Sequence, residues 1–129
     1  MQLAVGLRGE ATVTVVPENT AAAAGSGALP VFATPCMIAL MEQAALETVQ
    51  PYLDEGQGTV GTRIEVSHLA ATPVGMTVRA EAELTEIDRR RLGFAVRAYA
   101  GGELIGEGRH ERFIIDSERF LQKALAKRK

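Results

Sequence analysis

The sequence predicts an α+β fold in which one long helix lies across a curved antiparallel sheet. Two observations lead to this prediction. Apolar residues recur at helical spacing in one long segment, residues 37–49, and the chain beyond it consists mainly of long segments with strand-like alternation. Strands that follow one another in this way pair as neighbours, which is typical of α+β folds.

The composition is that of an ordinary globular domain. The chain has 129 residues, of which 47% are hydrophobic and 23% charged. This length supports one core, so we expect a single domain over residues 1–129. A formal net charge of −2 gives no general attraction to nucleic acid or membranes. With no Trp, two Tyr and four Phe, the chain also offers little surface for base stacking.

Several features favour a cytoplasmic protein. The single Cys36 cannot form an intramolecular disulfide, which is typical of a reducing compartment. The N-terminal residues lack the charged start and long apolar run of a signal peptide. No stretch approaches the roughly 18 consecutive apolar residues of a membrane span. Cys36 could act as a nucleophile early in the helix, but a small buried hydrophobe is the stronger interpretation.

The segment before the central helix contains one strand and a loop. Residues 10–16 (EATVTVV) alternate and are rich in Val and Thr, so they predict a first strand that ends at Pro17. Residues 18–30 include a four-alanine run that could form a helical turn. Gly25-Ser26-Gly27 within this segment nevertheless favours a mobile loop.

The central helix carries one residue that breaks its pattern. We expect Thr34 to be its N-cap and Pro35 its first residue. The apolar positions at helical spacing are Met37, Leu40, Met41, Ala44, Ala45 and Val49. Glu42 has only apolar residues at i±3 and i±4, whereas Glu47 has glutamines within reach. An ionised carboxylate buried among apolar side chains is costly, so Glu42 must be paired, protonated or used.

Four long strands and a short terminal helix are expected after the central helix. The strands are predicted at residues 60–70, 76–84, 92–100 and 104–115. In the first of them, the even positions Val60, Ile64, Val66, His68 and Ala70 should face inward. Gly106 and Gly108 indicate a bulge or a close backbone approach in the last strand. A short helix should begin at Ser117. One helix enclosed by such a five-stranded sheet is a hot-dog arrangement.

His68 is a second ionisable residue on an apolar face, and it lies on the sheet that faces the helix. A core histidine satisfied by a backbone carbonyl is the ordinary interpretation. Together with Glu42, however, it would form a natural general acid–base pair. Thr34 lies about 12 Å from Glu42 along the helix axis, too far for a hydrogen bond. If both act on one substrate, the substrate bridges them or a second subunit brings them together.

Three stretches resemble the fluoroacetyl-CoA thioesterase-like hot-dog family. They are VFATPCMIALMEQAALETVQPYL (residues 31–53), GTVGTRIEVSHLAATPVGMTVRAEAEL (residues 58–84) and GEGRHERFII (residues 106–115). This resemblance implies a hot-dog fold and an active homodimer or dimer of dimers. It also implies hydrolysis of a small or short-chain acyl-CoA to the free acid and CoA, with no cofactor besides the CoA of the substrate.

The resemblance also assigns site residues. The catalytic threonine, glutamate and histidine of the family fall on Thr34, Glu42 and His68. Its glycine that meets the thioester through the backbone falls on Gly61, and its substrate-side arginine falls on Arg112. Whether Glu42 would act as nucleophile or as general base stays open. The two histidines have no clustered Cys or carboxylate partners, so a metal site is not expected.

One departure from the family concerns substrate choice. The member specific for fluoroacetyl-CoA has a longer lid with aromatic side chains before Val-Phe-Ala-Thr. This chain has Gly25-Ser26-Gly27-Ala28-Leu29 there. Specificity for fluoroacetyl-CoA is therefore not expected. Two other functions stay open: a non-catalytic acyl-CoA-binding domain, and an enoyl-CoA hydratase or dehydratase.

Overall fold

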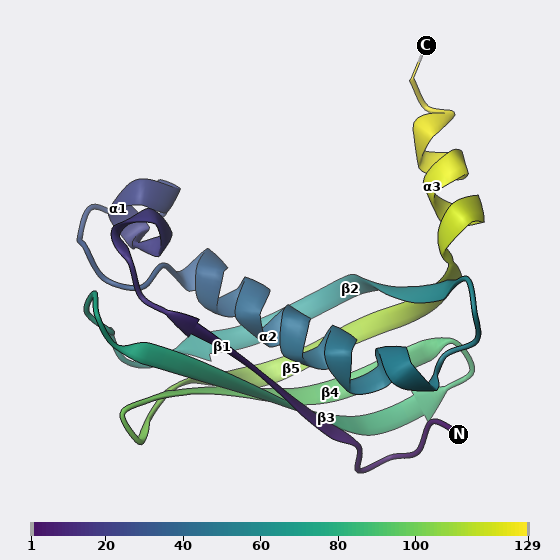
Figure 1. The fold of residues 1–129 in the computed structure, drawn as a ribbon, viewed down its shortest axis with the longest axis horizontal. Coiled ribbons are helices and arrows are strands. Elements are labelled where there is room, and N and C mark those ends of the chain that lie inside the picture. Colours follow the sequence, from purple (N-terminus) through teal and green to yellow (C-terminus); the bar gives the residue numbers. More distant parts are fainter. Residues whose placement is uncertain (1, 129) are drawn as a thin grey trace.

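The computed structural model describes residues 2–128, and a five-stranded antiparallel sheet forms its centre (Figure 1). The strand order is β1-β3-β4-β5-β2. The strands are β1 (Arg8–Thr14), β2 (Gln57–His68), β3 (Thr77–Asp88), β4 (Arg91–Ala100) and β5 (Glu103–Asp116). Met1 and Lys129, the two ends of the predicted domain, lie outside the described residues. Among residues 2–128, no helix has the length and apolar character needed to cross a membrane.

Helix α2 (Thr34–Val49) crosses one face of the sheet and packs mainly against β1 and β3 (Figure 1). Its fully buried side chains include Met37, Met41 and Val49, and they meet Leu84 and Phe94 of the sheet in one core. Burying a side chain of this size stabilises the fold by about 1.5–3 kcal/mol. The predicted helix across an antiparallel sheet is thus confirmed.

The start of α2 differs from the prediction. Ala33 is the N-cap, and its carbonyl accepts the backbone N–H groups of Cys36 and Met37 at 3.0 Å each. Thr34 is the first helical residue, and no side chain caps the helix. The prediction of a Thr34 cap is therefore wrong, because the extended backbone of Ala33 already fills that position. The Thr34 hydroxyl is consequently available for another partner.

The segment before α2 is more regular than predicted. Pro17–Asn19 forms the 3-10 turn η1, and the alanine run forms α1 (Ala21–Ala24). The Thr20 hydroxyl accepts the N–H of Ala23, and Gly25 (φ 79°) takes the left-handed conformation at the other end. The loop expectation is wrong for these four alanines, since capping at both ends satisfies the free backbone groups of so short a helix.

A bulge in β2 changes which residues face the helix. The register shifts between Gly61 and Arg63, so that Gly61 lies opposite Arg112 while Ile64 lies opposite His110. Both of those β5 partners are buried. Cross-strand partners share a face, so Gly61 points inward together with Ile64 and with the later even positions. The prediction that Val60 points inward is wrong, because the extra residue reverses the alternation.

The glycines of β5 confirm the predicted close approach. A Cβ at Gly106 would lie 2.5 Å from Met37 Sδ, so the absence of a side chain leaves room for the Met37 side chain of α2 against the strand. A Cβ at Gly108 would collide with the backbone carbonyl oxygen of Glu65. Beyond the strand, α3 (Ser117–Leu125) confirms the predicted terminal helix.

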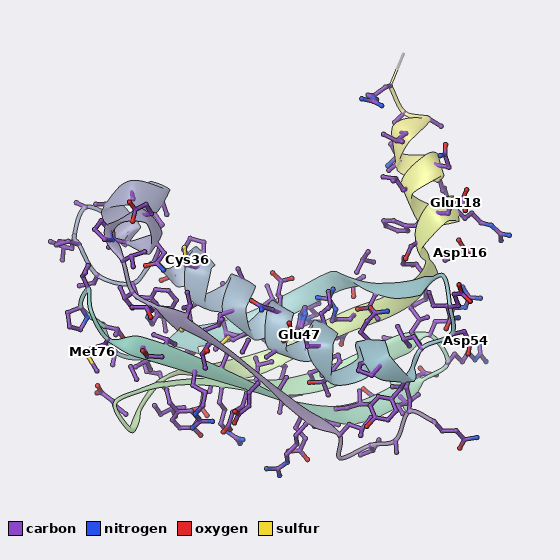
Figure 2. The ribbon with its side chains drawn as sticks, in the orientation of Figure 1. Cys36, Glu47, Asp54, Met76, Asp116 and Glu118 are labelled. Atoms are coloured by element: carbon purple, nitrogen blue, oxygen red, sulfur yellow. The ribbon has the colours of Figure 1, made fainter. Side chains whose placement is uncertain are left out.

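Helix α3 projects away from the sheet (Figure 1). Figure 2 marks Asp116 and Glu118 at its first turn, where the Asp116 carboxylate accepts the N–H of Arg119 at 3.0 Å. This side-chain cap, with Glu118 near the positive end of the helix dipole, is a favourable start for a short exposed helix.

Candidate active site

Thr34 and His68 meet within one chain. The Thr34 hydroxyl lies 2.7 Å from His68 Nδ1, which joins the first residue of α2 to the last residue of β2. Burial lowers the pKa of His68, so the imidazole is neutral near pH 7. Among the described residues, its buried Nε2 has no hydrogen-bond partner. A neutral imidazole bonded to a hydroxyl can take up or return a proton.

An open cleft of about 300 Å³ adjoins this pair. Besides Thr34 and His68, it is lined by Ala21, Ser26, Val31, Phe32, Leu69, Ala70 and Ala71. Most of these side chains are small, and Phe32, the aromatic member, is almost fully buried. The cleft therefore offers room for a short acyl group, with no exposed aromatic side chain among its lining residues.

Glu42 lies on α2 but not beside His68. Its side chain is 40% exposed, and its Oε2 lies 3.9 Å from Arg112 Nη1. The prediction that Glu42 is buried and paired with His68 is wrong for the single chain, because its own sheet covers this side of α2 only in part. Ile38 and Leu46, one turn away on either side, are only partly buried as well. Glu47, labelled in Figure 2, is exposed and pairs with Gln43, as an ordinary solvated charge does.

The side chains of Glu42 and Arg112 converge beside Gly61, which has no side chain to fill this space. A Cβ at Gly61 would lie 2.7 Å from Glu42 Oε2, 3.2 Å from His110 Cε1 and 3.4 Å from Arg112 Nη1. A side chain here would have to displace Glu42. The structure therefore brings together three of the five predicted site residues, Glu42, Gly61 and Arg112.

Two further polar residues belong to this cluster. Arg112 is 5% exposed, and its Nε–H donates to Thr59 Oγ1 at 2.8 Å while an Nη1–H donates to His110 Nε2 at 3.1 Å. The sequence interpretation did not select His110 or Thr59. His110 could have been found from its position two residues before Arg112, which places both on one face of a strand. Thr59 could not, because it precedes the predicted strand at residues 60–70 and the bulge places it on the inward face.

The described part of the chain therefore contains two separate clusters of predicted site residues, which we call half-sites. One holds Thr34 and His68, and the other holds Glu42, Gly61 and Arg112. No group of three or more His, Cys, Asp or Glu residues within residues 2–128 is placed to hold a metal ion.

Comparison with known proteins assigns the class. Residues 15–118 match the family model described as fluoroacetyl-CoA-specific thioesterase. A fluoroacetyl-CoA thioesterase from Streptantibioticus cattleyicolor is 47% identical over 97 residues, which cover 75% of this chain and 70% of that protein. A solved structure of the fluoroacetyl-CoA thioesterase superposes with a TM-score of 0.92 at 39% identity, over 100% of both chains.

A hot-dog-like protein from Thermanaerovibrio acidaminovorans shares the fold, with a TM-score of 0.86 at 21% identity over 97% of this chain and 93% of that one. The predicted hot-dog fold is thus confirmed, and together with the sequence matches it defines the class as a hot-dog thioesterase. The chain belongs to the fluoroacetyl-CoA-specific thioesterase family.

Proposed function

We propose that this thioesterase hydrolyses a small or short-chain acyl-CoA at a site shared by two copies of the chain. The observation that carries the proposal is the separation of the two half-sites. Thr34 bonds His68, whereas Glu42, on the same helix, pairs with Arg112. A helical rise of about 1.5 Å per residue keeps Thr34 and Glu42 about 12 Å apart along the axis. A second subunit would supply the missing half to each site.

Two features support a homodimer. Strand β2 is at the edge of the sheet, so one side of its backbone is free to pair with another strand. Helix α2 has apolar residues on nearly all sides, including the partly buried Ile38 and Leu46, which is typical of a helix covered on more than one face.

These features favour one arrangement of the dimer. If β2 pairs antiparallel with its copy about a two-fold axis at Glu65, the extra residue of the bulge brings Gly61 opposite the partner subunit's His68. Because of the bulge, both residues point to the helix side of the sheet. Glu42, which lies against Gly61, would then approach the partner subunit's Thr34–His68 pair.

The proposed reaction follows from these roles. Water adds its oxygen to the thioester carbonyl, the C–S bond breaks, and CoA leaves as a thiol. Glu42 either takes the proton of this water or first attacks the carbonyl itself. Thr34 orients the attacking group or the carbonyl, the Gly61 N–H holds the carbonyl oxygen, and His68 shuttles to the sulfur the proton that the water gives up. Heavy-oxygen water tests the covalent route, since label enters the Glu42 carboxylate only when water attacks the Glu42 carbonyl of an anhydride intermediate.

The acyl group is proposed to be small, without selection for the fluorinated one. The cleft beside Thr34 has no exposed aromatic residue among its described lining residues, so no aromatic ring closes over a substituent. We expect kcat/KM values for fluoroacetyl-CoA and acetyl-CoA within about tenfold of each other, at the low end of the roughly 1–3 kcal/mol that a small difference is worth in an apolar pocket. A cytoplasmic location, suggested by the single cysteine, stays a prediction.

The central experiment is a panel of acyl-CoA substrates, assayed by release of the CoA thiol. Turnover of short acyl-CoAs that is lost in Glu42→Ala supports the proposal. Full activity in Glu42→Ala contradicts it. Tight CoA binding without turnover would indicate the non-catalytic domain, and hydration of an enoyl-CoA, seen as lost ultraviolet absorbance, would indicate the hydratase.

A further inference from the structure

His110 lies at the centre of the Glu42 half-site, between the β2 bulge and Arg112. Its side chain is 1% exposed, on β5. His110 Nδ1 lies 2.7 Å from the backbone carbonyl oxygen of Arg63, at the bulge. His110 Nε2 lies 3.1 Å from Arg112 Nη1. The imidazole of His110 therefore connects the bulge of β2 to the buried guanidinium of Arg112.

The two partners fix the tautomer of this ring. A carbonyl oxygen only accepts hydrogen bonds, so His110 Nδ1 carries the proton and donates to Arg63. A guanidinium only donates, so Nε2 of His110 offers its lone pair to Arg112. Both contacts can exist together only when the imidazole is neutral. Burial, helped by the positive charge of Arg112, lowers the pKa of His110 and favours that form.

The neutral ring completes the restraint of Arg112. Thr59 accepts from Arg112 twice, through its hydroxyl at 2.8 Å and its backbone carbonyl at 3.0 Å. His110 accepts from Nη1, the nitrogen that also faces Glu42 at 3.9 Å. Three contacts therefore hold the guanidinium plane, and the one made by His110 directs the nitrogen that attracts the Glu42 carboxylate.

We propose that His110 is a positioning residue that fixes the Arg112 guanidinium, and through it the Glu42 carboxylate, for thioester hydrolysis. The inference rests on the proposed role of Glu42 in that reaction. Gly61 makes this arrangement possible. The side chains of Glu42, His110 and Arg112 converge where a Cβ of residue 61 would lie, so they have little room to move apart. Protonation of His110 would remove the lone pair at Nε2 that accepts from Arg112, and the new positive charge would repel the guanidinium. At acid pH the Glu42 carboxylate should therefore lose its fixed position.

Several charged groups surround His110 and bear on its titration. Glu42 faces it from α2, and Glu111 and Arg112 from β5, with both carboxylates favouring protonation. Arg63, Glu65 and Arg109 line a small pocket at the same ring. From β4, the neutral ring of Phe94 lies 6.1 Å from the imidazole, centroid to centroid. Burial outweighs the favourable charges, and the net direction is a lowered pKa.

Two substitutions separate the two hydrogen bonds. His110→Gln keeps a carbonyl oxygen near the position of Nε2 and can still accept from Arg112. His110→Asn keeps a donor near Nδ1 for the Arg63 carbonyl but is too short to reach Arg112. We expect His110→Asn to lose about ten- to a hundredfold in kcat with little change in KM, and His110→Gln to recover most of that loss. Equal kcat values in the two variants would overturn the proposal.

The pH profile gives a readout that a purely structural role would not change. The acid limb of kcat should reflect two groups, His68 and His110, in the native enzyme and one group in His110→Gln. An acid limb unchanged by His110→Gln would overturn the proposal.

Nitrogen NMR of the Arg112 guanidinium tests the restraint without turnover. Its Nη signals should shift on acidification of the native protein and in His110→Asn, while the Nε–H bonded to Thr59 stays in place. Unchanged Nη signals in both cases would overturn the restraint itself. If the native protein hydrolyses no acyl-CoA, the proposed function fails, yet this measurement still decides whether His110 holds Arg112. The native acidification also gives an answer if a variant does not fold.

Discussion

The Thr34 hydroxyl lies 2.7 Å from His68 Nδ1 within a single chain, although the two residues come from the start of the central helix and the end of an edge strand. Thr34 does not cap the helix, so this hydrogen bond is the contact that the structure gives its hydroxyl. A surface threonine with such a partner has a role that can be tested apart from stability.

Replacing Thr34 by Val should remove activity without unfolding the protein. Thr34 is exposed, so the stability should change by no more than about 0.5 kcal/mol. We expect kcat to fall by about 10²- to 10⁴-fold, the usual contribution of acid–base catalysis, because Thr34 holds His68 through this hydrogen bond. Thr34→Ser is the matched control, because it keeps the hydroxyl and should keep most of the activity. Urea unfolding and thiol-release kinetics measure the two quantities, and a stability loss that accounts for the inactivity would contradict this role.

Mixing two inactive variants should restore activity if the site is shared between subunits. In a heterodimer of Thr34→Ala with Glu42→Ala, one of the two sites receives both intact residues. Random exchange of subunits should therefore give about a quarter of native activity. The measurement is thiol release after the mixture is unfolded and refolded together.

The control for this mixing experiment is Thr34→Ala with His68→Ala. Thr34 and His68 contribute to the same half-site from one chain, so no heterodimer has an intact pair. We expect no recovery. Recovery in the control, or none in the first mixture, would contradict the shared site.

Gly61→Ala should impair catalysis more than folding. The added Cβ would lie 2.7 Å from Glu42 Oε2 and would push the carboxylate away from its position. A displacement of about 1 Å can cost about a hundredfold in rate, so we expect kcat to fall by at least about tenfold. Gly58→Ala on the same strand is the control, since its Cβ would meet the Ser117 hydroxyl at 2.9 Å and not Glu42. Similar kcat values in the two variants would argue against a close packing requirement at Gly61.

The protein should lose stability as the pH falls below about 6.5. Burial lowers the pKa values of both His68 and His110 from the ordinary value of 6.5. The unfolded chain therefore binds protons before the folded chain does, so stability is complete above this pH and declines towards the lowered folded pKa values. Urea unfolding between about pH 7.5 and pH 5.5 measures the slope, which should be smaller in His110→Gln. A stability that is flat or rises on acidification over this range would contradict the assigned directions.

Much of the fold could be predicted because its elements have local causes. The apolar spacing of residues 37–49 and the alternation of the later strands reflect which side of each element meets the core. The helical turn at Ala21–Ala24 could not be predicted with the same ease, since a four-residue helix depends on its caps. Its caps, Thr20 and Gly25, are visible in the sequence, but their use depends on how Val31 and Phe32 fix the segment.

The order of residues was enough to predict the elements and to select Thr34, Glu42 and His68 as residues of unusual chemistry for their positions. Their partners came from the tertiary structure, which pairs Thr34 with His68 and Glu42 with Arg112. The cause is that partners depend on long-range backbone register. One extra residue between Gly61 and Arg63 turns Thr59 and Gly61 toward the helix, and His110 completes the cluster from the facing strand. Periodicity reports the face that a residue prefers, but not the neighbour that it meets there.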